Sequence, residues 1–199
     1  MGIATLFDLV GSIIIGGLLL ITLLKLNDNA TRNTYTFSGE LIVQENLVTS
    51  VEVLEYDFRK IGYCEDPFAI PNPTKAILYA DSTDIKYLTD VDFDGTPDTV
   101  RYYLGPASEL TGTPNPNDRM LYQEINGDAA AVNLGITLFN IKYFGALGEE
   151  LSLPRTFAPT GIFSMQIDIR IENVAAYDEE YRYAFWRQIR LASRNLDNR

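Results

Sequence analysis

Histidine is absent from this chain of 199 residues, and cysteine occurs only once, at Cys64. Without histidine, the chain lacks the commonest general base and the commonest ligand of transition metals. A lone cysteine cannot form an intramolecular disulfide bond, so we expect Cys64 to be a small, partly buried apolar residue. The sequence also lacks a G-x-S-x-G motif, a P-loop and a paired-cysteine metal motif. These absences predict a protein that is not an enzyme.

Positive charge is scarce. The chain has 16 lysine and arginine residues against 27 aspartate and glutamate residues, which gives a net charge of −11. Such a surface repels a polyanion, so we expect no nucleic-acid partner, and cations are the better-suited small ligands.

Basic residues are missing from the start of the chain. Asp8 is the only charged residue before Lys25, and residues 9–24 form an apolar run. About 20 apolar residues span a bilayer as a helix. A cleavable secretory signal has a basic region before its apolar run and a small-residue cleavage site after it, and neither is found here. The sequence therefore predicts a hydrophobic transmembrane helix over residues 1–26.

Asp8 is the anomaly of this helix. A carboxylate within an apolar membrane helix costs a few kcal/mol unless it is paired, which makes Asp8 a candidate functional residue. The alternative is that Asp8 lies at the membrane interface and is simply hydrated. The residues alone leave both interpretations open.

Two further segments follow the apolar run. Residues 27–37 are polar and turn-prone, which predicts a bend. An amphipathic helix is then predicted over about 38–62, with Ser38 as its N-cap and Gly62 as its terminator. Its apolar stripe, which we expect to face a core, consists of Leu47, Val51, Leu54, Phe58 and Ile61.

Beyond residue 75 the apolar period changes from that of a helix to that of a strand. Short β-branched or aromatic runs, separated by turn residues, occupy residues 76–80, 85–88, 99–104, 120–125, 136–144, 163–174 and 182–192. In the sixth run, apolar side chains at 165, 167, 169 and 171 alternate with polar ones, as expected for a sheet with one buried face. The predicted fold class is α+β: a long N-terminal helix, with a transmembrane half and an amphipathic half, packed on an antiparallel sheet over about 76–192. The globular domain is predicted to comprise residues 38–199.

An acidic loop precedes the third of these runs. Its candidate calcium ligands are Asp90, Asp92, Asp94, Asp98 and the backbone carbonyl of Thr96, with Gly95 at the sixth loop position. Arg101 stands where an EF-hand has its bidentate glutamate, so the loop is not an EF-hand. The alternative is a solvated acidic β-turn with Asp94 and Gly95 as the turn pair.

Several segments resemble one protein family. Residues 5–9 (TLFDL) followed by the apolar run resemble the type IV pilin signature. Residues 54–63 (LEYDFRKIGY) are similar to the end of the long helix in W-type minor pilins and J-type pseudopilins. Residues 135–144, 161–170 and 187–196 resemble strands and the tail of the same group, in the same order along the chain.

The resemblance implies a pilin-like fold and a structural role in a type IV pilus-like filament or a type II secretion pseudopilus. It also implies that residues 1–26 are a transmembrane and polymerisation helix, and that Asp8 is an assembly residue that pairs with the N-terminal amine of a neighbouring subunit. The partners would be copies of this chain or related pilins. The location would be the bacterial inner membrane and then an extracytoplasmic filament, in the periplasm or at the cell surface. The alternative is a membrane-tethered extracytoplasmic binding domain that does not polymerise.

Overall fold

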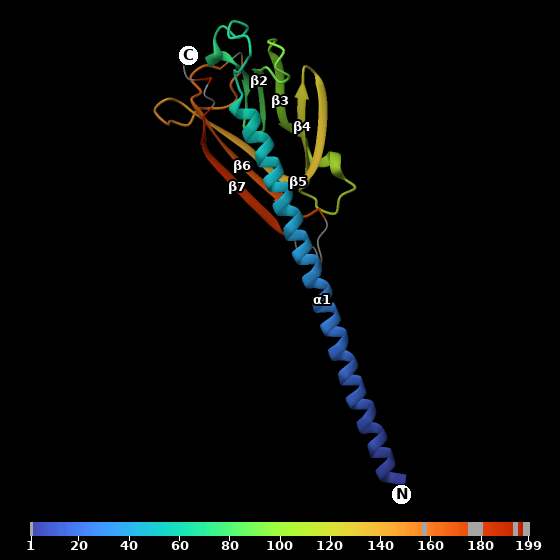
Figure 1. Cartoon of the computed structure of the whole chain (residues 1–199). Coiled ribbons are helices and arrows are strands. Elements are labelled where there is room, and N and C mark those ends of the chain that lie inside the picture. The colour runs from blue at the N-terminus through green and yellow to red at the C-terminus, as the bar shows by residue number, and fades with distance from the viewer. Residues whose placement is uncertain (1, 157–158, 175–180, 193–194, 197–199) are drawn as a thin grey trace.

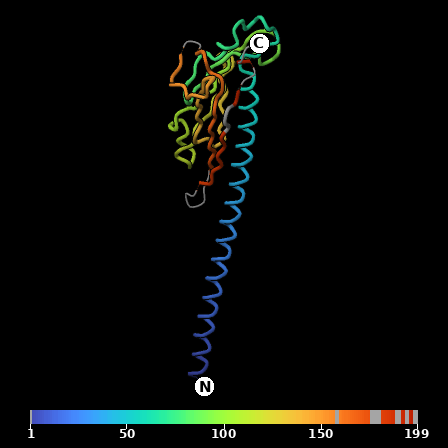
Figure 2. The backbone as a smooth tube through the Cα atoms, turned by 90° about the vertical axis from the view of Figure 1, so that its left-hand side faces the viewer, coloured from blue at the N-terminus to red at the C-terminus, as the bar shows by residue number. Residues whose placement is uncertain are grey.

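The computed structural model describes residues 2–156, 159–174, 181–192 and 195–196. Its first element is helix α1, Gly2–Arg59, whose 58 residues extend over about 87 Å at 1.5 Å per residue. Figures 1 and 2 show that the N-terminal part of α1 projects from the rest of the molecule as a rod. Gly39 is the first buried residue of α1. The chain therefore consists of a free helical stalk and a domain that packs on the second part of the same helix.

The bend predicted for residues 27–37 is wrong, because α1 is helical throughout this segment. The side chains of Thr31 and Thr34 donate hydrogen bonds to the carbonyl oxygens four residues earlier, at 2.9 and 3.0 Å. The segment contains neither glycine nor proline, and its polar residues each cost the helix less than about 0.7 kcal/mol. Ser38 consequently lies inside a helix instead of capping one.

The second part of α1 is amphipathic, as the sequence predicts. Leu54, Phe58 and Ile61 are buried, while Leu47 and Val51 pack against the core from its margin. The helix ends at Arg59, three residues before Gly62, which has a φ of 76°. The predicted stripe therefore faces the sheet, and the predicted terminator follows within one turn.

The remainder of the domain is one antiparallel sheet in which each strand pairs with the next along the chain. Its strands are β1 Ile77–Ala80, β2 Asp84–Thr89, β3 Asp98–Leu104, β4 Arg119–Ile125, β5 Asp128–Phe144, β6 Ser164–Glu172 and β7 Tyr183–Leu191. Short 3₁₀ helices, η1 Pro73–Lys75 and η2 Ala107–Leu110, lie in the connections before β1 and between β3 and β4. All seven predicted runs are strands, which confirms the α+β fold class.

One strand begins earlier than predicted. β5 starts at Asp128, because Asn126 and Gly127 form a two-residue hairpin with φ values of 54° and 97°. An Asn-Gly pair favours such a turn because both central residues need a positive φ. The prediction that β5 begins at residue 136 overlooked this signal.

The two faces of the sheet differ in character. Met165, Ile167, Ile169 and Ile171 of β6 have no exposed surface, and they point toward the side on which α1 packs against β5, β6 and β7. The ring of Phe58 anchors the helix there by edge contacts with the rings of two tyrosines of β2 and β3, at centroid distances of 5.9 and 5.6 Å. The alternation predicted for residues 165–171 is therefore confirmed.

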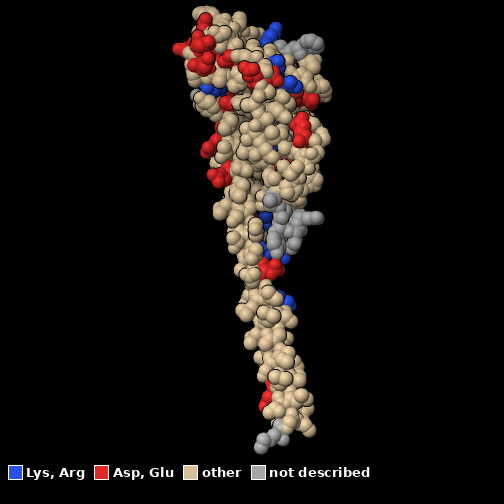
Figure 3. Space-filling view, turned by 90° about the vertical axis from the view of Figure 1, so that its right-hand side faces the viewer, with Lys and Arg blue, Asp and Glu red and all other residues tan. Residues whose placement is uncertain are grey.

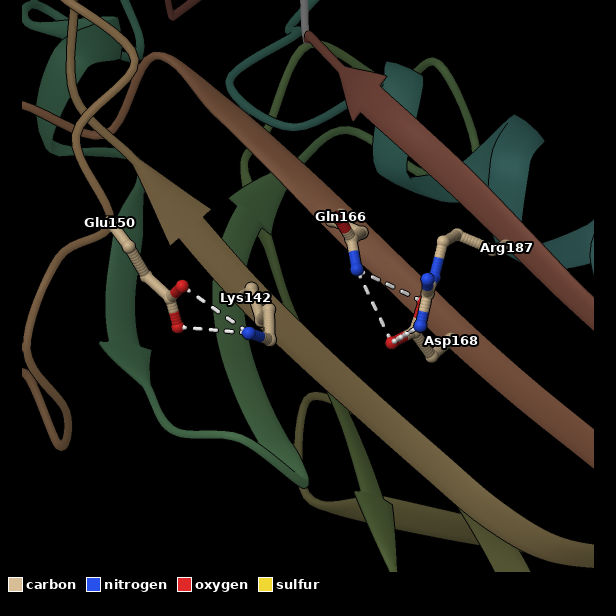
Figure 4. Close-up of polar contacts among 5 residues, drawn as sticks. All are labelled: Lys142, Glu150, Gln166, Asp168 and Arg187. Carbon is tan, nitrogen blue, oxygen red and sulfur yellow. Dashed lines mark hydrogen bonds and ion pairs between the residues drawn. The ribbon is translucent and has the colours of Figure 1, made fainter.

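The opposite face of the sheet carries charge pairs (Figure 4). Arg187 on β7 donates a hydrogen bond of 2.7 Å to Asp168 on β6, and Lys142 on β5 lies 3.2 Å from Glu150. Asp168 is only 6% exposed beneath its partners, whereas both members of the Lys142–Glu150 pair are open to solvent, where a pair contributes at most about 1 kcal/mol. This face therefore carries polar and charged side chains instead of an apolar layer.

Candidate functional site

The stalk of α1 carries the largest exposed apolar surface of the described chain. Its large apolar side chains between Ile3 and Leu26 are each between 46% and 75% exposed. Among the described residues, α1 is the one helix that is long and apolar enough to cross a membrane, and its apolar window has no buried residue. A surface of this size is unfavourable in water and requires a bilayer or other protein helices around it.

Asp8 lies on this stalk and is exposed. Its backbone carbonyl accepts a hydrogen bond of 2.7 Å from the hydroxyl of Ser12. In the part of the chain that the structure describes, no group pairs with the carboxylate of Asp8. A compensating positive charge, if the segment is in a membrane, would have to come from another molecule.

The exposed apolar surface continues beyond the predicted membrane segment. Tyr35, Phe37, Leu41 and Ile42 are between 51% and 67% exposed on α1. The sequence analysis did not identify these residues as functional. In the sequence these residues stand out as two apolar pairs: Tyr35 and Phe37 at the end of the polar segment, and Leu41 and Ile42 about one turn later.

A groove opens where α1 passes the β4–β5 hairpin. It holds a cavity of about 210 Å³, lined by side chains that include Val53 of α1, Leu121 of β4 and Val132 of β5. Val53 and Val132 are 48% and 49% exposed, so the groove is open to solvent. Nothing in the sequence pattern predicted this groove, because its walls come from elements far apart in the chain.

The aspartate loop lies between β2 and β3 and is organised by Asp90, which is fully buried. One carboxylate oxygen accepts hydrogen bonds from the backbone N–H groups of Phe93 and Asp94, at 2.7 and 3.2 Å. The other accepts from the N–H groups of Glu65 and Gly95, at 3.1 and 3.0 Å. Asp90 therefore ties its own loop to the segment that follows α1.

The hydrogen bonds at Asp90 also set its ionisation. Burial by itself would raise the pKa of this carboxyl, but the four backbone N–H donors outweigh burial and lower the pKa below its usual value. Asp90 is thus a carboxylate at neutral pH, and its charge is stabilised by backbone groups of the loop.

The other predicted ligands of the loop lie in different arrangements. Asp90, Asp92 and Asp98 place one carboxylate oxygen each within 4.8 Å of one another, and Asp94 is outside this group. An oxygen of Asp94 accepts a hydrogen bond of 2.6 Å from the backbone N–H of Thr96. Asp98 accepts from the N–H of a loop residue at 2.9 Å and from a side-chain amide at 2.7 Å. A calcium ion in this loop stays a prediction.

The backbone of this loop has two residues with positive φ: Phe93, at 64°, and Gly95, at 82°, with Asp94 between them. A type I′ turn at Asp94 and Gly95 would need a positive φ at both residues, whereas a type II turn needs it only at the glycine. A solvated acidic turn with Asp94 and Gly95 as its pair stays a prediction.

Charge is distributed unevenly over the molecule. Figure 3 shows acidic side chains gathered over the domain, whereas the stalk is almost uncharged on the face in view. The molecule therefore separates an apolar helical stalk, which is compatible with membrane anchoring, from an acidic domain.

The comparisons with known proteins add no family. No protein-family model matches the chain, and neither a curated protein nor a solved structure matches it. What the structure establishes is an α+β protein whose long, apolar N-terminal helix packs on an antiparallel sheet.

Proposed function

We propose that this chain is a structural subunit of a type IV pilus-like filament or of a secretion pseudopilus, and that it assembles through residues 1–26. The observation that supports the proposal most directly is the exposed apolar stalk, which projects away from the acidic domain. The resemblance of several segments to pilins, in the right order along the chain, supports the same conclusion. In this proposal the domain faces outward from the filament.

The stalk has features suited to packing against copies of itself. Gly11, Gly16 and Gly17 lie in open space, since a Cβ added to any of them would meet nothing within 4 Å. Small residues let neighbouring membrane helices approach closely, and close packing supplies the attraction that lipid-exposed helices otherwise lack. Before assembly the stalk would be held in the bacterial inner membrane, and after assembly it would lie in the core of an extracytoplasmic filament.

Asp8 would set the register of this assembly. Its unpaired carboxylate favours neighbours that bring a positive group to it, such as the N-terminal amine of an adjacent subunit, because an unpaired charge is costly in an apolar environment. Subunits packed in other registers leave the charge uncompensated.

The test replaces Asp8 with alanine in the full chain. We expect the yield of filaments to fall at least about tenfold, because an ion pair worth about 1.4 kcal/mol corresponds to that factor. The readout is electron microscopy together with the pelletable fraction after detergent removal. The domain should remain folded, as judged by its circular dichroism.

Asp28→Asn provides the matched control, since it removes a carboxylate from the same helix beyond the apolar run. It should leave the yield unchanged. Normal filaments from the Asp8→Ala chain would refute the role of Asp8, whereas no filaments from the unmodified chain would refute the proposed function itself.

A second candidate function is a membrane-tethered binding domain that does not polymerise. The open groove between α1 and the β4–β5 hairpin favours it, because a cavity of about 210 Å³ accommodates side chains or a small molecule. Imaging of the purified full chain distinguishes the two. A tethered module would give only detergent-bound monomers.

A further inference from the structure

The β3–β4 connection contains a buried carboxylate whose charge is incompletely compensated. Asp118, the residue before β4, is only 1% exposed. Its Oδ2 atom accepts a hydrogen bond of 3.0 Å from the side-chain amide of Asn133, but its Oδ1 atom is buried and has no hydrogen-bond partner. Among the described residues, no lysine or arginine forms an ion pair with Asp118. A buried charge in this state is costly.

The surroundings of Asp118 are rich in oxygen atoms. The hydroxyl of Thr113 lies 3.0 Å from the carbonyl oxygen of Leu110 and 3.3 Å from that of Asn115. The Asn115 carbonyl also accepts a hydrogen bond of 3.3 Å from the backbone N–H of Asp118, so this oxygen lies beside the backbone of Asp118. The hydroxyl of Thr113 has a single proton, which it can give either to one of these carbonyls or to the carboxylate of Asp118, whose pKa it lowers as a donor.

A second acid makes the local charge more negative. Burial raises the pKa of Asp118, and the charge of Glu172, at the end of β6, raises it further against the effect of nearby donors. Glu172 is held by Arg170 at 3.1 Å and by the amide of Asn115 at 3.0 Å. Arg170 thus compensates the charge of Glu172.

We infer that the orphaned Oδ1 atom of Asp118, with the oxygen atoms of the loop beside it, binds a hard divalent cation of the calcium type. Carboxylate, hydroxyl and backbone carbonyl oxygens are the ligands that Ca²⁺ takes in proteins. The cation would remove the repulsion between Asp118 and Glu172. This site is separate from the Asp90 loop, and it does not depend on polymerisation.

The position of the site suggests what the cation would do. The amide of Asn115 also donates to the carbonyl oxygen of Asn173, at 3.4 Å. The side chain of Asn173 lies against α1 at Gly39, where an added Cβ would meet it. Figure 1 shows the β3–β4 connection at the end of the domain that faces the stalk. A cation at Asp118 would therefore fasten the loop and the end of β6 where α1 leaves the domain.

The experiment measures calcium binding to the full chain in detergent after removal of metals. The starting variant is Asp92→Asn, which takes an exposed carboxylate out of the Asp90 loop. Calorimetric titration with up to about 5 mM Ca²⁺ covers the affinities of extracellular calcium modules. We expect this variant to bind one ion and to unfold at a higher temperature with Ca²⁺ than with chelator.

Adding Asp118→Asn to the Asp92→Asn chain should abolish both effects. Equal binding by the two variants would overturn the inference, because the ion would then be held elsewhere. A lack of binding by the Asp92→Asn chain would also overturn the inference. This second outcome can be read even if the Asp118→Asn variant does not fold. In that case a proton or ordered water would be what satisfies Asp118.

Discussion

At the scale of single residues, the core contains polar groups that only long-range contacts satisfy. The hydroxyl of Tyr102 on β3 donates to the carboxylate of Asp57 on α1, and the amide of Gln123 on β4 lies 2.6 Å from the same hydroxyl. This network connects the end of α1 to the middle of the sheet. Removing one member leaves buried partners unpaired, which costs about 1–3 kcal/mol.

Buried tyrosines predict a loss of stability in alkali. Burial raises the pKa values of Tyr87, Tyr102 and Tyr143 well above that of a free phenol, and at Tyr102 the carboxylate of Asp57 adds to the effect. In the unfolded chain these phenols ionise near pH 10. Above that pH the unfolded state binds fewer protons than the folded state, so the free energy of unfolding falls as pH rises.

We expect the urea midpoint of the full chain to fall between about pH 9 and pH 11, followed through the fluorescence of Trp186, the single tryptophan. Tyr102→Phe should make this decline shallower. The control is Tyr183→Phe, which changes a tyrosine that is 67% exposed and should leave the decline unaltered. An equally steep decline in all three proteins would contradict the assignment to buried tyrosines.

At the scale of secondary-structure elements, α1 joins two environments without a break. Its exposed stalk and its buried stripe have different compositions, yet the backbone hydrogen bonds continue through the polar residues between them. Because the helix is continuous, a force or a rotation applied to the stalk is transmitted to the sheet through α1 itself.

A distance measurement tests this continuity. Spin labels on Leu24→Cys and Glu45→Cys, in a chain with Cys64→Ser, flank the segment for which a bend was predicted. The two positions are 21 residues apart in sequence, which corresponds to a rise of about 32 Å in an unbroken helix, so we expect a narrow distribution near that distance by electron spin resonance. Thr31→Pro, which kinks a helix, should shorten and broaden it. A short distance without the proline would contradict the continuous helix.

At the scale of the whole molecule, the net charge of −11 opposes the packing of one domain beside another. In the proposed filament, the stalks would attract each other through apolar contact, whereas the domains would repel each other through their carboxylates. The balance between the two forces depends on ionic strength, because salt screens charges and leaves apolar contact largely intact.

If the chain polymerises as proposed, salt should promote assembly. Raising NaCl from about 10 mM to about 150 mM shortens the Debye length from about 30 Å to about 8 Å. We expect the pelletable fraction to rise severalfold, in the presence of chelator so that divalent cations play no part. Sucrose at matched osmolarity serves as the uncharged control. A fraction that falls or stays constant with salt would show that domain repulsion does not limit assembly.

Most of the fold could be predicted from local pattern. The stripe containing Leu54 and Phe58 has a helical period, and the residues around Ile167 alternate, so both faces were assigned correctly. The errors lie at junctions. Residues 27–37 contain turn-forming residue types but no residue that excludes a helix, and the Asn126–Gly127 hairpin was overlooked.

Less of the candidate site could be predicted. The aspartates of the Asp90 loop are adjacent in sequence, but the sequence does not reveal that Asp90 uses its oxygens on backbone groups of its own loop and of residue 65. Nothing in the sequence pattern indicated a site at Asp118, because the residues that act on it come from other elements. Asn133 of β5 donates a hydrogen bond to it, and the charge of Glu172 of β6 raises its pKa. The groove beside Val53 was likewise invisible, since it exists only where α1 crosses the β4–β5 hairpin.

The sequence by itself determined that an apolar helical segment with very few charges precedes an acidic domain of helix and strands, because hydrophobic periodicity and charge are properties of neighbouring residues. Only the tertiary structure decided that the rod is unbroken, which face of α1 stays open, and which carboxylates are satisfied. Those outcomes depend on contacts between residues that are far apart in sequence, and packing of the helix on the sheet determines which of these contacts form.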